Sequence, residues 1–303
     1  MNLINPEVRL ETTNFCNARC TICPREKMTR PMMTMDLEHY KTIVDQVADL
    51  GAEEISPFGY GEPLMDKGIV AKVAYANSRH LATFLTTNAS LLNETKGLEL
   101  IDSGLSHIRF SVHGVGKAYE EVHLNLSWKK TKGNIVSFLK SNAERGYPVK
   151  VDLSFIPMGI YTQDDIDNII AMWENAGIND IEMWKPHNWT TGRGYREVTL
   201  RKKTCGRPQR GPIQIQADGK AIVCCFDFDG VLTVGDTHNE TIQKILRGDR
   251  YREIRHRHED GNLEGLLCET CDQLNEGDSP LLYSTVDKGR ESGRTSSTKF
   301  RLL

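Results

Sequence analysis

Three cysteines lie close together near the start of the sequence, in the stretch "ETTNFCNARCTICPRE" that covers residues 11–26. Cys16, Cys20 and Cys23 follow the spacing C-x₃-C-x₂-C. A structural zinc ion takes four protein ligands, and this stretch contains no histidine to complete the set. Thiolates also bind iron–sulfur clusters. Three thiolates would hold a [4Fe–4S] cluster and leave its fourth iron open to a small molecule, so we favour such a cluster here.

A second set of cysteines lies in the C-terminal third of the chain: Cys205, Cys224, Cys225, Cys268 and Cys271. The segment "GPIQIQADGKAIVCC" ends on the adjacent pair and predicts a β-hairpin that turns at residues 218–219. A hairpin followed by the final C-x₂-C pair could hold a zinc ion on four thiolates or an iron–sulfur cluster. Cys225 is the uncertain member, because a free cysteine is most often a buried small residue but could also replace a ligand.

Strand-like and helix-like segments alternate from residue 7 to about residue 186. The predicted strands fall within residues 8–12, 53–63, 81–88, 107–114, 149–155 and 180–186. Strands separated by helices pair in parallel through right-handed crossovers, and about 180 residues are short for a closed eight-stranded barrel, which needs ~250. The sequence therefore predicts an α/β fold, a partial (β/α)₆ barrel with a small C-terminal domain of a β-hairpin plus helix. The first cysteine loop follows the first strand, at the edge where such barrels carry their active sites.

The predicted elements divide the chain into four regions. We expect a barrel over residues 1–190, a basic linker over 191–204, a cluster-binding domain over 205–275 and a loosely ordered polar tail over 276–303. The tail is rich in Ser, Gly and Arg, a composition typical of loose segments.

Composition excludes several classes of protein. The chain has 303 residues, 39% of them apolar and 26% charged, as in ordinary folded proteins. No window approaches the ~20 apolar residues of a membrane span, and "MNLINPEVRL" lacks the features of a secretory signal. The formal net charge of −3 argues against broad binding to nucleic acid. We expect a cytoplasmic protein that binds neither membrane nor nucleic acid and whose eight cysteines are ligands or reactive thiols.

Three further patterns are given simpler interpretations. The stretch 193–210 holds seven Lys or Arg residues and could clamp a phosphate or carboxylate, but a solvated linker is the commoner role of such a run. "DFDGVLT" at 227–233 matches the nucleophile motif of haloacid-dehalogenase phosphatases, but it adjoins a cysteine pair and we assign it to the exit of the hairpin. "RHRHED" at 255–260 is typical of a solvated helix end.

The first cysteine spacing resembles the signature of the radical SAM superfamily, C-x₃-C-x-aromatic/apolar-C. Three further segments resemble that family at the ends of successive strands: "GYGEPLM" at 59–65, "TTNAS" at 86–90 and "FSVHG" at 110–114. The resemblance spans about residues 6–186 and implies that S-adenosylmethionine (SAM) is bound by Ile22, Gly59, Gly61, Glu62, Pro63, Asn88 and Ser111, beside a [4Fe–4S] cluster on the three cysteines. His113 stands where many members have Asp.

The second cysteine set resembles the SPASM domains that follow many radical SAM barrels. The run from Cys205 through Gly219 to Cys224 resembles the opening of such a domain, and the single later pair resembles its shortened Twitch form. This resemblance implies an auxiliary [4Fe–4S] cluster on Cys205, Cys224, Cys268 and Cys271. The overall plan is similar to that of the butirosin aminocyclitol dehydrogenase.

The resemblance also implies a reaction. A flavodoxin or ferredoxin-type donor would reduce the first cluster, SAM would be cleaved to a 5′-deoxyadenosyl radical, and this radical would take a hydrogen atom from the substrate. Positions at strand ends make His113, Asp152 and Lys185 candidate bases, and Cys225 a candidate hydrogen-atom donor. We expect oxidation or epimerisation of a carbohydrate-like or other small polar metabolite.

Two alternatives remain open at this point. The chain could instead modify a peptide or protein side chain, as the peptide-maturing and sulfatase-maturating members of the superfamily do. It could also be a zinc-stabilised binding protein without catalysis.

Overall fold

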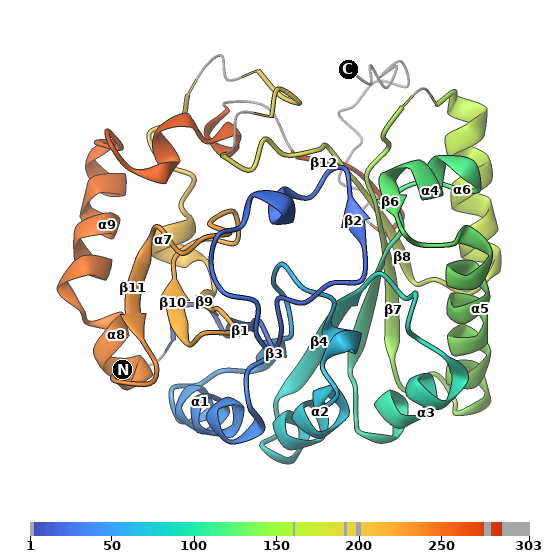
Figure 1. Cartoon of the computed structure of the whole chain (residues 1–303), viewed down its shortest axis with the longest axis horizontal. Coiled ribbons are helices and arrows are strands. Elements are labelled where there is room, and N and C mark those ends of the chain that lie inside the picture. Colours follow the sequence, from blue (N-terminus) through green and yellow to red (C-terminus); the bar gives the residue numbers. More distant parts are fainter. Residues whose placement is uncertain (1–2, 160, 191–192, 198–200, 276–279, 287–303) are drawn as a thin grey trace.

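A computed structural model describes residues 3–159, 161–190, 193–197, 201–275 and 280–286. Ten strands of these residues form one sheet in the order β11-β10-β9-β1-β3-β4-β5-β7-β8-β12, and they follow an arc in Figure 1. The six strands of the barrel pair in parallel with one another: β1 (Glu7–Leu10), β3 (Glu54–Ser56), β4 (Ala82–Thr87), β5 (His107–Ser111), β7 (Lys150–Phe155) and β8 (Asp180–Trp184). The predicted partial (β/α)₆ barrel is confirmed.

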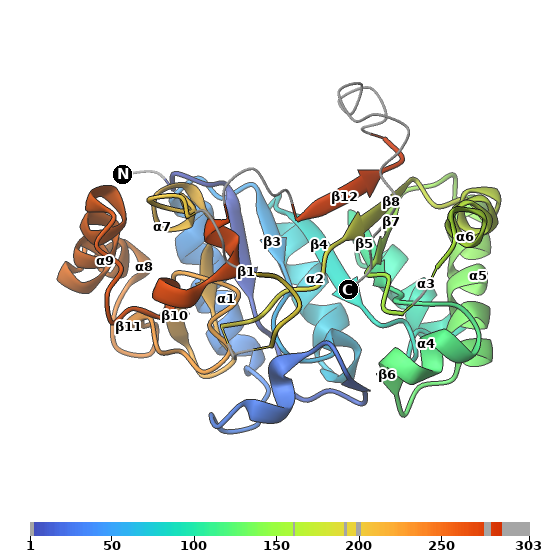
Figure 2. The ribbon, with the colours of Figure 1, turned by 90° about the horizontal axis from the view of Figure 1, so that it is seen from above.

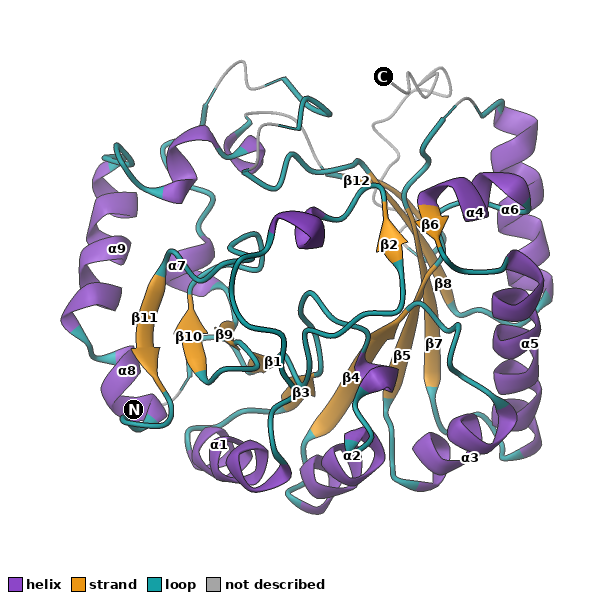
Figure 3. Ribbon diagram, viewed as in Figure 1, coloured by secondary structure: helices purple, strands orange, loops and turns teal. Residues whose placement is uncertain are grey.

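Helices cover the outer side of the arc (Figure 3). They are α1 (Leu37–Asp49), α2 (Ile69–Ser78), α3 (Glu94–Asp102), α4 (Lys117–Val122), α5 (Trp128–Glu144) and α6 (Gln163–Asn175). Local sequence fixes their starts: the Asp36 side chain accepts the His39 N–H at α1, and Thr162 and Asp165 form a capping box at α6. No helix in the described part of the chain is long and apolar enough to cross a membrane.

Alternation along the strands separates an apolar outer face from a polar inner face. Ile108 and Phe110 of β5 are fully buried in the hydrophobic core that includes Phe138 of α5. Because successive side chains point to opposite faces of a sheet, Arg109 lies on the concave side. Asp152 of β7 is its register partner, so charged side chains meet across neighbouring strands inside the arc.

The C-terminal region extends the barrel sheet. It contains α7 (Arg207–Arg210), β9 (Ile213–Ile215), β10 (Lys220–Ile222), β11 (Thr233–Asp236), α8 (Ile242–Leu246) and α9 (Asp249–Asp260). The predicted hairpin is confirmed, with Gly219 at φ +80° in its turn. Strand β9 pairs in parallel with β1, and Ile213 and Ile254 share a hydrophobic core with Val8. The hairpin is therefore continuous with the barrel, next to β1 (Figure 1).

Short elements complete the structure. Strands β2 (Arg19–Cys20) and β6 (His123–Leu124) form a separate two-stranded ladder, and 3₁₀ helices cover Pro24–Lys27, Pro63–Met65, Leu267–Thr270 and Asp272–Leu274.

One expectation about the C-terminus is wrong for residues 280–286. The sequence predicted a loosely ordered tail over 276–303, but β12 (Leu281–Ser284) pairs with β8 in antiparallel fashion at the edge of the sheet (Figure 2). The buried carboxylate of Asp180 accepts hydrogen bonds from Ser284 Oγ and from Thr285 N and Oγ1, at 2.9–3.1 Å. These bonds and the apolar run at 281–283 fix the segment. Residues 276–279 and 287–303 lie outside the described residues.

Candidate functional site

The first cysteine loop leaves β1 at the carboxyl edge of the sheet, and its three thiols lie near one another. Burial raises the pKa of the Cys20 thiol, and the neighbouring Cys23 and Cys16 raise it further. Burial also raises the pKa of Cys23, to about 11. In the absence of metal these thiols are therefore protonated at neutral pH, and binding of a metal cluster would release their protons.

Backbone pairing and side-chain amides hold this loop in place. Cys20 lies opposite His123 in the β2–β6 ladder. Asn17, between the first two cysteines, donates to Ser90 Oγ at 2.8 Å and accepts from Asn88 Nδ2 at 3.1 Å. The loop is thus fastened to the end of β4, where the sequence analysis placed Asn88 as a SAM contact.

The glycine–glutamate loop after β3 is packed tightly against the end of β1. A Cβ on Gly61 would lie 2.0 Å from the Thr13 carbonyl oxygen, and one on Gly59 would lie 2.4 Å from Glu11 Cγ. Pro63 begins the 3₁₀ helix that follows this loop. Gly61 is therefore required by the close approach of the Thr13 backbone, whereas Gly59 is confined by the Glu11 side chain. The proposed contacts of Gly59, Gly61 and Pro63 with SAM remain predictions.

Glu62 connects this loop with the end of β4. Its carboxylate is 2% exposed and accepts from Thr87 Oγ1 at 2.6 Å and from the Asn88 N–H at 2.8 Å. Burial raises the pKa of Glu62, and these two bonds oppose the shift. Glu62, predicted to contact SAM, thus also joins two strand ends.

Ile22 and Ser111 lie in different surroundings. The Ile22 side chain is buried in a small apolar cluster with Val122 and Ile156, and its carbonyl accepts the Trp189 Nε1–H at 2.8 Å. Ser111 ends β5 on the same face as Arg109, which alternation places on the concave side. Their roles toward SAM stay predictions.

His113 is packed within the protein. Its side chain is buried, and Nδ1 accepts the Ile156 N–H at 3.1 Å. Burial lowers the pKa of His113 to about 4. The imidazole is therefore neutral near pH 7, and its Nδ1 is already occupied by a backbone donor.

The placement of Asp152 at a strand end is wrong, because it is the third residue of β7, and it lies at the centre of a charged group on the concave face. Its Oδ2 is 2.6 Å from His107 Nε2, 3.3 Å from Lys150 Nζ and 3.5 Å from Arg109 Nη2. Burial alone would raise the pKa of Asp152, but the His107 hydrogen bond and these charges outweigh it and hold the pKa below its usual range. Asp152 therefore stays ionised and is a weak base.

The same face carries residues that the sequence analysis missed. Arg109 Nη2 donates to Glu182 Oε1 at 2.9 Å, and Trp184 Nε1 donates to Glu182 Oε2 at 3.0 Å. Burial raises the pKa of Glu182. Strand alternation was the available signal, because Arg109, Asp152 and Glu182 all lie on the face opposite to the apolar positions. Lys185 follows β8, and its N–H donates to the Pro280 carbonyl at 2.8 Å.

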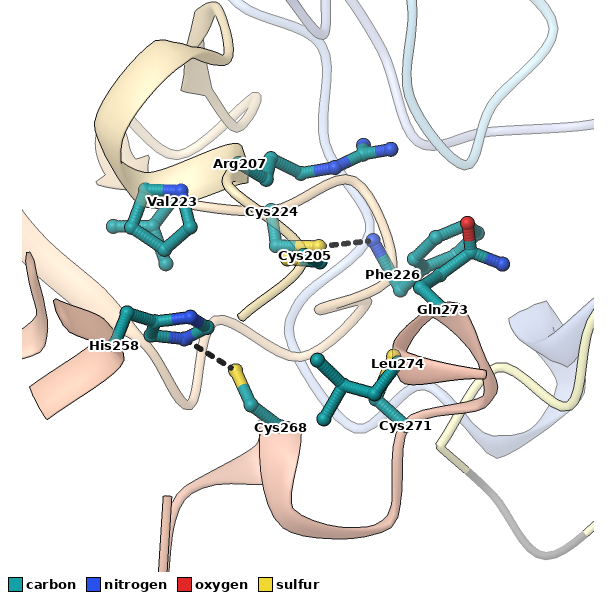
Figure 4. Close-up of a pocket in the computed structure, with 11 residues that line it drawn as sticks. Cys205, Arg207, Val223, Cys224, Phe226, His258, Cys268, Cys271, Gln273 and Leu274 are labelled. Carbon is teal, nitrogen blue, oxygen red and sulfur yellow. Dashed lines mark hydrogen bonds between the residues drawn. The ribbon is translucent and has the colours of Figure 1, made fainter. Parts of the chain in front are cut away.

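The second cysteine set surrounds a cavity (Figure 4). Cys205, Cys224, Cys268 and Cys271 line one partly open space of about 350 Å³, a volume that includes open solvent. Within the described residues, no three His, Cys, Asp or Glu side chains converge so as to hold a single metal ion. Four thiols around one space match the ligand set of a [4Fe–4S] cluster and also that of a structural zinc ion.

Cys225 does not line this cavity, although its side chain is hydrogen-bonded to that of Cys224. Its Sγ accepts from Arg207 Nη1 at 2.6 Å. It lines a second cavity, of about 260 Å³, together with Glu11, Gly59, Tyr60, Gln214 and Gln216, among others. The structure therefore brings Cys224 to the proposed cluster site, whereas Cys225 faces the loops at the ends of β1 and β3.

The interpretation of residues 255–260 as a solvated helix end is wrong for one residue. His256 is 74% exposed and lies near Asp260, but His258 is fully buried. The Nε2 atom of His258 is 3.3 Å from Cys268 Sγ. Helical periodicity places these two histidines on different sides of α9.

The expectation of a solvated basic linker is wrong for Arg193 and Arg196, whereas residues 201–203 are exposed. Arg193 donates to the carbonyls of Thr21 and Cys23 and lies 2.8 Å from Glu26. Arg196 pairs with Asp272 at 3.0 Å, with both side chains buried. These arginines join the first cysteine loop and the C-terminal region to the intervening segment.

The "DFDGVLT" stretch follows the hairpin strand β10, as expected. The carboxylate of Asp227 accepts the backbone N–H groups of Val231 and Leu232 at 2.8 and 2.6 Å and so shapes its own turn. The first acidic residue of the phosphatase-like motif therefore has a structural role in this turn.

Family profiles match two parts of the chain. The profile described as the radical SAM superfamily matches residues 10–172, and the SPASM profile, described as an iron–sulfur cluster-binding domain, matches residues 205–272. The two matches contain the first and second cysteine sets, respectively.

Curated relatives are similar over parts of their length. A PqqA peptide cyclase of Bradyrhizobium diazoefficiens is 32% identical over 109 residues, which cover 36% of this chain and 28% of the relative. A GTP 3′,8-cyclase of Saccharophagus degradans is 25% identical over 289 residues, which cover 79% of this chain and 82% of the relative. The chain thus spans less than a third of the length of the first of these relatives.

Solved structures share the fold. The complex of BtrN with AdoMet and 2-DOIA aligns with a TM-score of 0.66 at 19% identity and covers 93% of this chain and 100% of BtrN. Streptococcus suis SuiB bound to the precursor peptide SuiA aligns with a TM-score of 0.67 at 13% identity, over 89% of this chain and 70% of SuiB. At these identities the likeness concerns the fold alone.

Proposed function

Because the chain belongs to the radical SAM superfamily and carries a SPASM-type cluster-binding domain, we propose that it oxidises or epimerises a small polar metabolite. The proposed ligands of the SAM-binding cluster are Cys16, Cys20 and Cys23, and those of the auxiliary cluster are Cys205, Cys224, Cys268 and Cys271. When bound, SAM and the two clusters supply abstraction of a hydrogen atom from the substrate and removal of an electron from it.

The charged concave face is the observation that carries this proposal. Asp152 Oδ1 and Arg109 Nε are buried and have no hydrogen-bond partner among the described residues. Buried polar atoms are normally paired, so these two suit the hydroxyl or amino groups of a ligand. Arg109 lies over the ring of Phe84, which in turn stacks on His107, so the charged groups are held in place by aromatic contacts.

Glu182 is the best proton acceptor on this face. Its carboxylate has a pKa raised by burial, whereas Asp152 has a lowered pKa and His113 has its Nδ1 occupied. General bases work best when their pKa lies near the working pH. A proton leaving the oxidised carbon would therefore pass to a Glu182 oxygen.

Aromatic side chains lie between the two cysteine regions and would exclude water. Trp189 lies 6.0 Å from Tyr60 and 5.2 Å from Phe226, measured between ring centroids. Tyr60 donates its hydroxyl to the Cys225 carbonyl at 2.5 Å. These rings connect the barrel loops to the C-terminal region and would shield a reactive substrate from solvent.

Modification of a peptide side chain is the second candidate. The similarity to PqqA peptide cyclase supports it, and so does the shared fold of SuiB. The concave face would then bind the side chain that is modified. In both cases the enzyme needs a reductant, and we propose a flavodoxin or ferredoxin as the donor.

The test measures formation of 5′-deoxyadenosine by anaerobically reconstituted protein with SAM and dithionite. We expect polyhydroxylated or amino-substituted metabolites to increase it and to be oxidised or epimerised, whereas peptides leave it at the background rate. Stimulation by peptides alone would reject the first candidate in favour of the second. Cys16→Ala should abolish the signal in either case, and a protein that holds zinc without iron or sulfide would reject both.

A further inference from the structure

Each cysteine site has one buried histidine beside a proposed ligand. His123 Nδ1 is 3.2 Å from Cys20 Sγ, and His258 Nε2 is 3.3 Å from Cys268 Sγ. The two histidines are 1% and 0% exposed, respectively. A ring nitrogen can either donate to a sulfur or accept from it, so the direction depends on the opposite nitrogen of each ring.

The contacts of His123 fix its hydrogen on the nitrogen nearest the sulfur. Nε2 accepts the backbone N–H of His113 at 3.0 Å, so it carries no hydrogen. The remaining hydrogen lies on Nδ1, which faces Cys20. The ring is stacked between His113 and Tyr119, at centroid distances of 5.0 and 4.4 Å. Its backbone pairs with that of Cys20 in the β2–β6 ladder, which fixes the distance between the two side chains.

The contacts of His258 also place the ring hydrogen on the nitrogen nearest the sulfur, which in this case is Nε2. Thr204 Oγ1 lies 2.9 Å from Nδ1 and accepts the Gly206 N–H at 2.9 Å. As a cluster ligand, Cys268 is a thiolate without a hydrogen, so its contact with His258 is a hydrogen bond only when the ring hydrogen lies on Nε2. Nδ1 then accepts from the Thr204 hydroxyl. Figure 4 shows this contact at the rim of the cavity.

We propose that His123 and His258 each donate an N–H···S hydrogen bond to a cluster thiolate and thereby raise the reduction potential of that cluster. Reduction adds negative charge to the cluster and its thiolates, and an N–H dipole directed at a sulfur stabilises that charge. His123 acts on the SAM-binding cluster through Cys20, and His258 acts on the auxiliary cluster through Cys268. Both histidines are positioning residues, because each acts through the cysteine ligand that it contacts. The proposal depends on the two clusters and is independent of the substrate.

The test is an anaerobic redox titration followed by EPR, on the full chain with both clusters loaded. The two signals can be told apart because SAM binds only the cluster with an open iron. His123→Phe should shift the SAM-binding cluster to a more negative potential and leave the auxiliary cluster unchanged, and His258→Phe should do the reverse. A tenfold change in the equilibrium between oxidised and reduced cluster corresponds to about 59 mV for one electron.

Donor-retaining variants and a surface control separate hydrogen bonding from packing. His123→Asn places an amide nitrogen near the position of Nδ1, and His258→Gln places one near Nε2, so both should restore the potential toward that of the unaltered protein. His256→Phe, at an exposed position of α9, should shift neither cluster. Unchanged potentials in the two histidine-to-phenylalanine variants, or equal shifts of both clusters in either one, would overturn the proposal.

A measurement on the unaltered chain tests the proposal even if the variants fail to fold. With ¹⁵N-labelled histidine, pulsed EPR of each reduced cluster should show a weak ¹⁵N coupling and an exchangeable proton. Absence of both features from the two clusters would also overturn the proposal.

Discussion

The carboxylate of Asp229 accepts two hydrogen bonds from Thr29, from the backbone N–H at 2.7 Å and from the hydroxyl at 3.1 Å. Thr29 follows the first cysteine loop. Asp229 lies 200 residues later, shortly after the adjacent cysteines 224 and 225. The buried ion pair between Arg30 and Glu11 adjoins Thr29 along the chain, with both side chains 4% exposed. The two cysteine regions are therefore joined by side chains that come from both of them.

Removal of the Asp229 carboxylate should weaken this connection. We expect Asp229→Ala to lower the free energy of unfolding by about 1 kcal/mol, the usual net value of hydrogen bonds that are partly solvated. Asp229→Asn keeps an oxygen that can accept the Thr29 N–H, so its free energy of unfolding should fall by less. Urea denaturation of the full chain measures both values, and equal losses in the two variants would contradict the assigned role of the bond.

The adjacent cysteines should differ in their effect on iron content. Cys224 lines the cavity with three other thiols, whereas Cys225 lies against Arg207. We expect Cys224→Ala to lose about four of about eight irons, and Cys225→Ala to keep them all. Iron and sulfide analysis after anaerobic reconstitution tests this. Iron loss in Cys225→Ala alone would mean that the ligand assignment is reversed.

Two glycines should respond to alanine in opposite directions. A Cβ at Gly61 would overlap the Thr13 carbonyl, so Gly61→Ala should destabilise the protein by about 1–3 kcal/mol. Gly133 lies within α5 with nothing within 4 Å of an added Cβ, so Gly133→Ala should stabilise by about 0.5–1 kcal/mol. Thermal unfolding of both variants gives the sign, and a stable Gly61→Ala protein would show that the loop can move away from β1.

The buried imidazole of His113 should make stability depend on pH. Its pKa is lowered from 6.5 to about 4 on folding, so between these values the unfolded chain binds a proton that the folded chain does not. Stability should therefore fall as the pH drops through this window, by up to about 3 kcal/mol. His113→Asn keeps an acceptor for the Ile156 N–H without titrating. Its stability should vary less between pH 6.5 and 4, as measured by urea denaturation at each pH, and an unchanged profile would argue against this assignment.

Glu182 should affect the reaction more than the binding of SAM. If its carboxylate accepts the substrate proton, Glu182→Gln should lower the rate of substrate oxidation by about 10²- to 10⁴-fold. Background cleavage of SAM without substrate should stay the same. Glu121→Gln, at an exposed position, is the control. Full activity of Glu182→Gln would remove this residue as the base and leave Lys185 as the remaining candidate.

Local patterns in the sequence were sufficient for the barrel and for both cysteine sets. Strand–helix alternation, the C-x₃-C-x₂-C spacing and the Asp-Gly turn at 218–219 are properties of short segments. Such segments adopt their conformation through nearby backbone and side-chain chemistry, so their order along the chain predicts the fold. The sequence also indicated which residues could bind metal, because cysteine spacing is itself local.

Only the tertiary structure decided which side chains meet. His123 reaches Cys20 across 103 residues, and Arg193 reaches Cys23 across 170. Cys224 lines the cavity and Cys225 does not because of the side of the hairpin exit that faces it, and β12 is ordered because Asp180 and β8 lie at the sheet edge to receive it. These contacts depend on the packing of elements that are far apart in the chain. Neither residue type nor spacing encodes that packing.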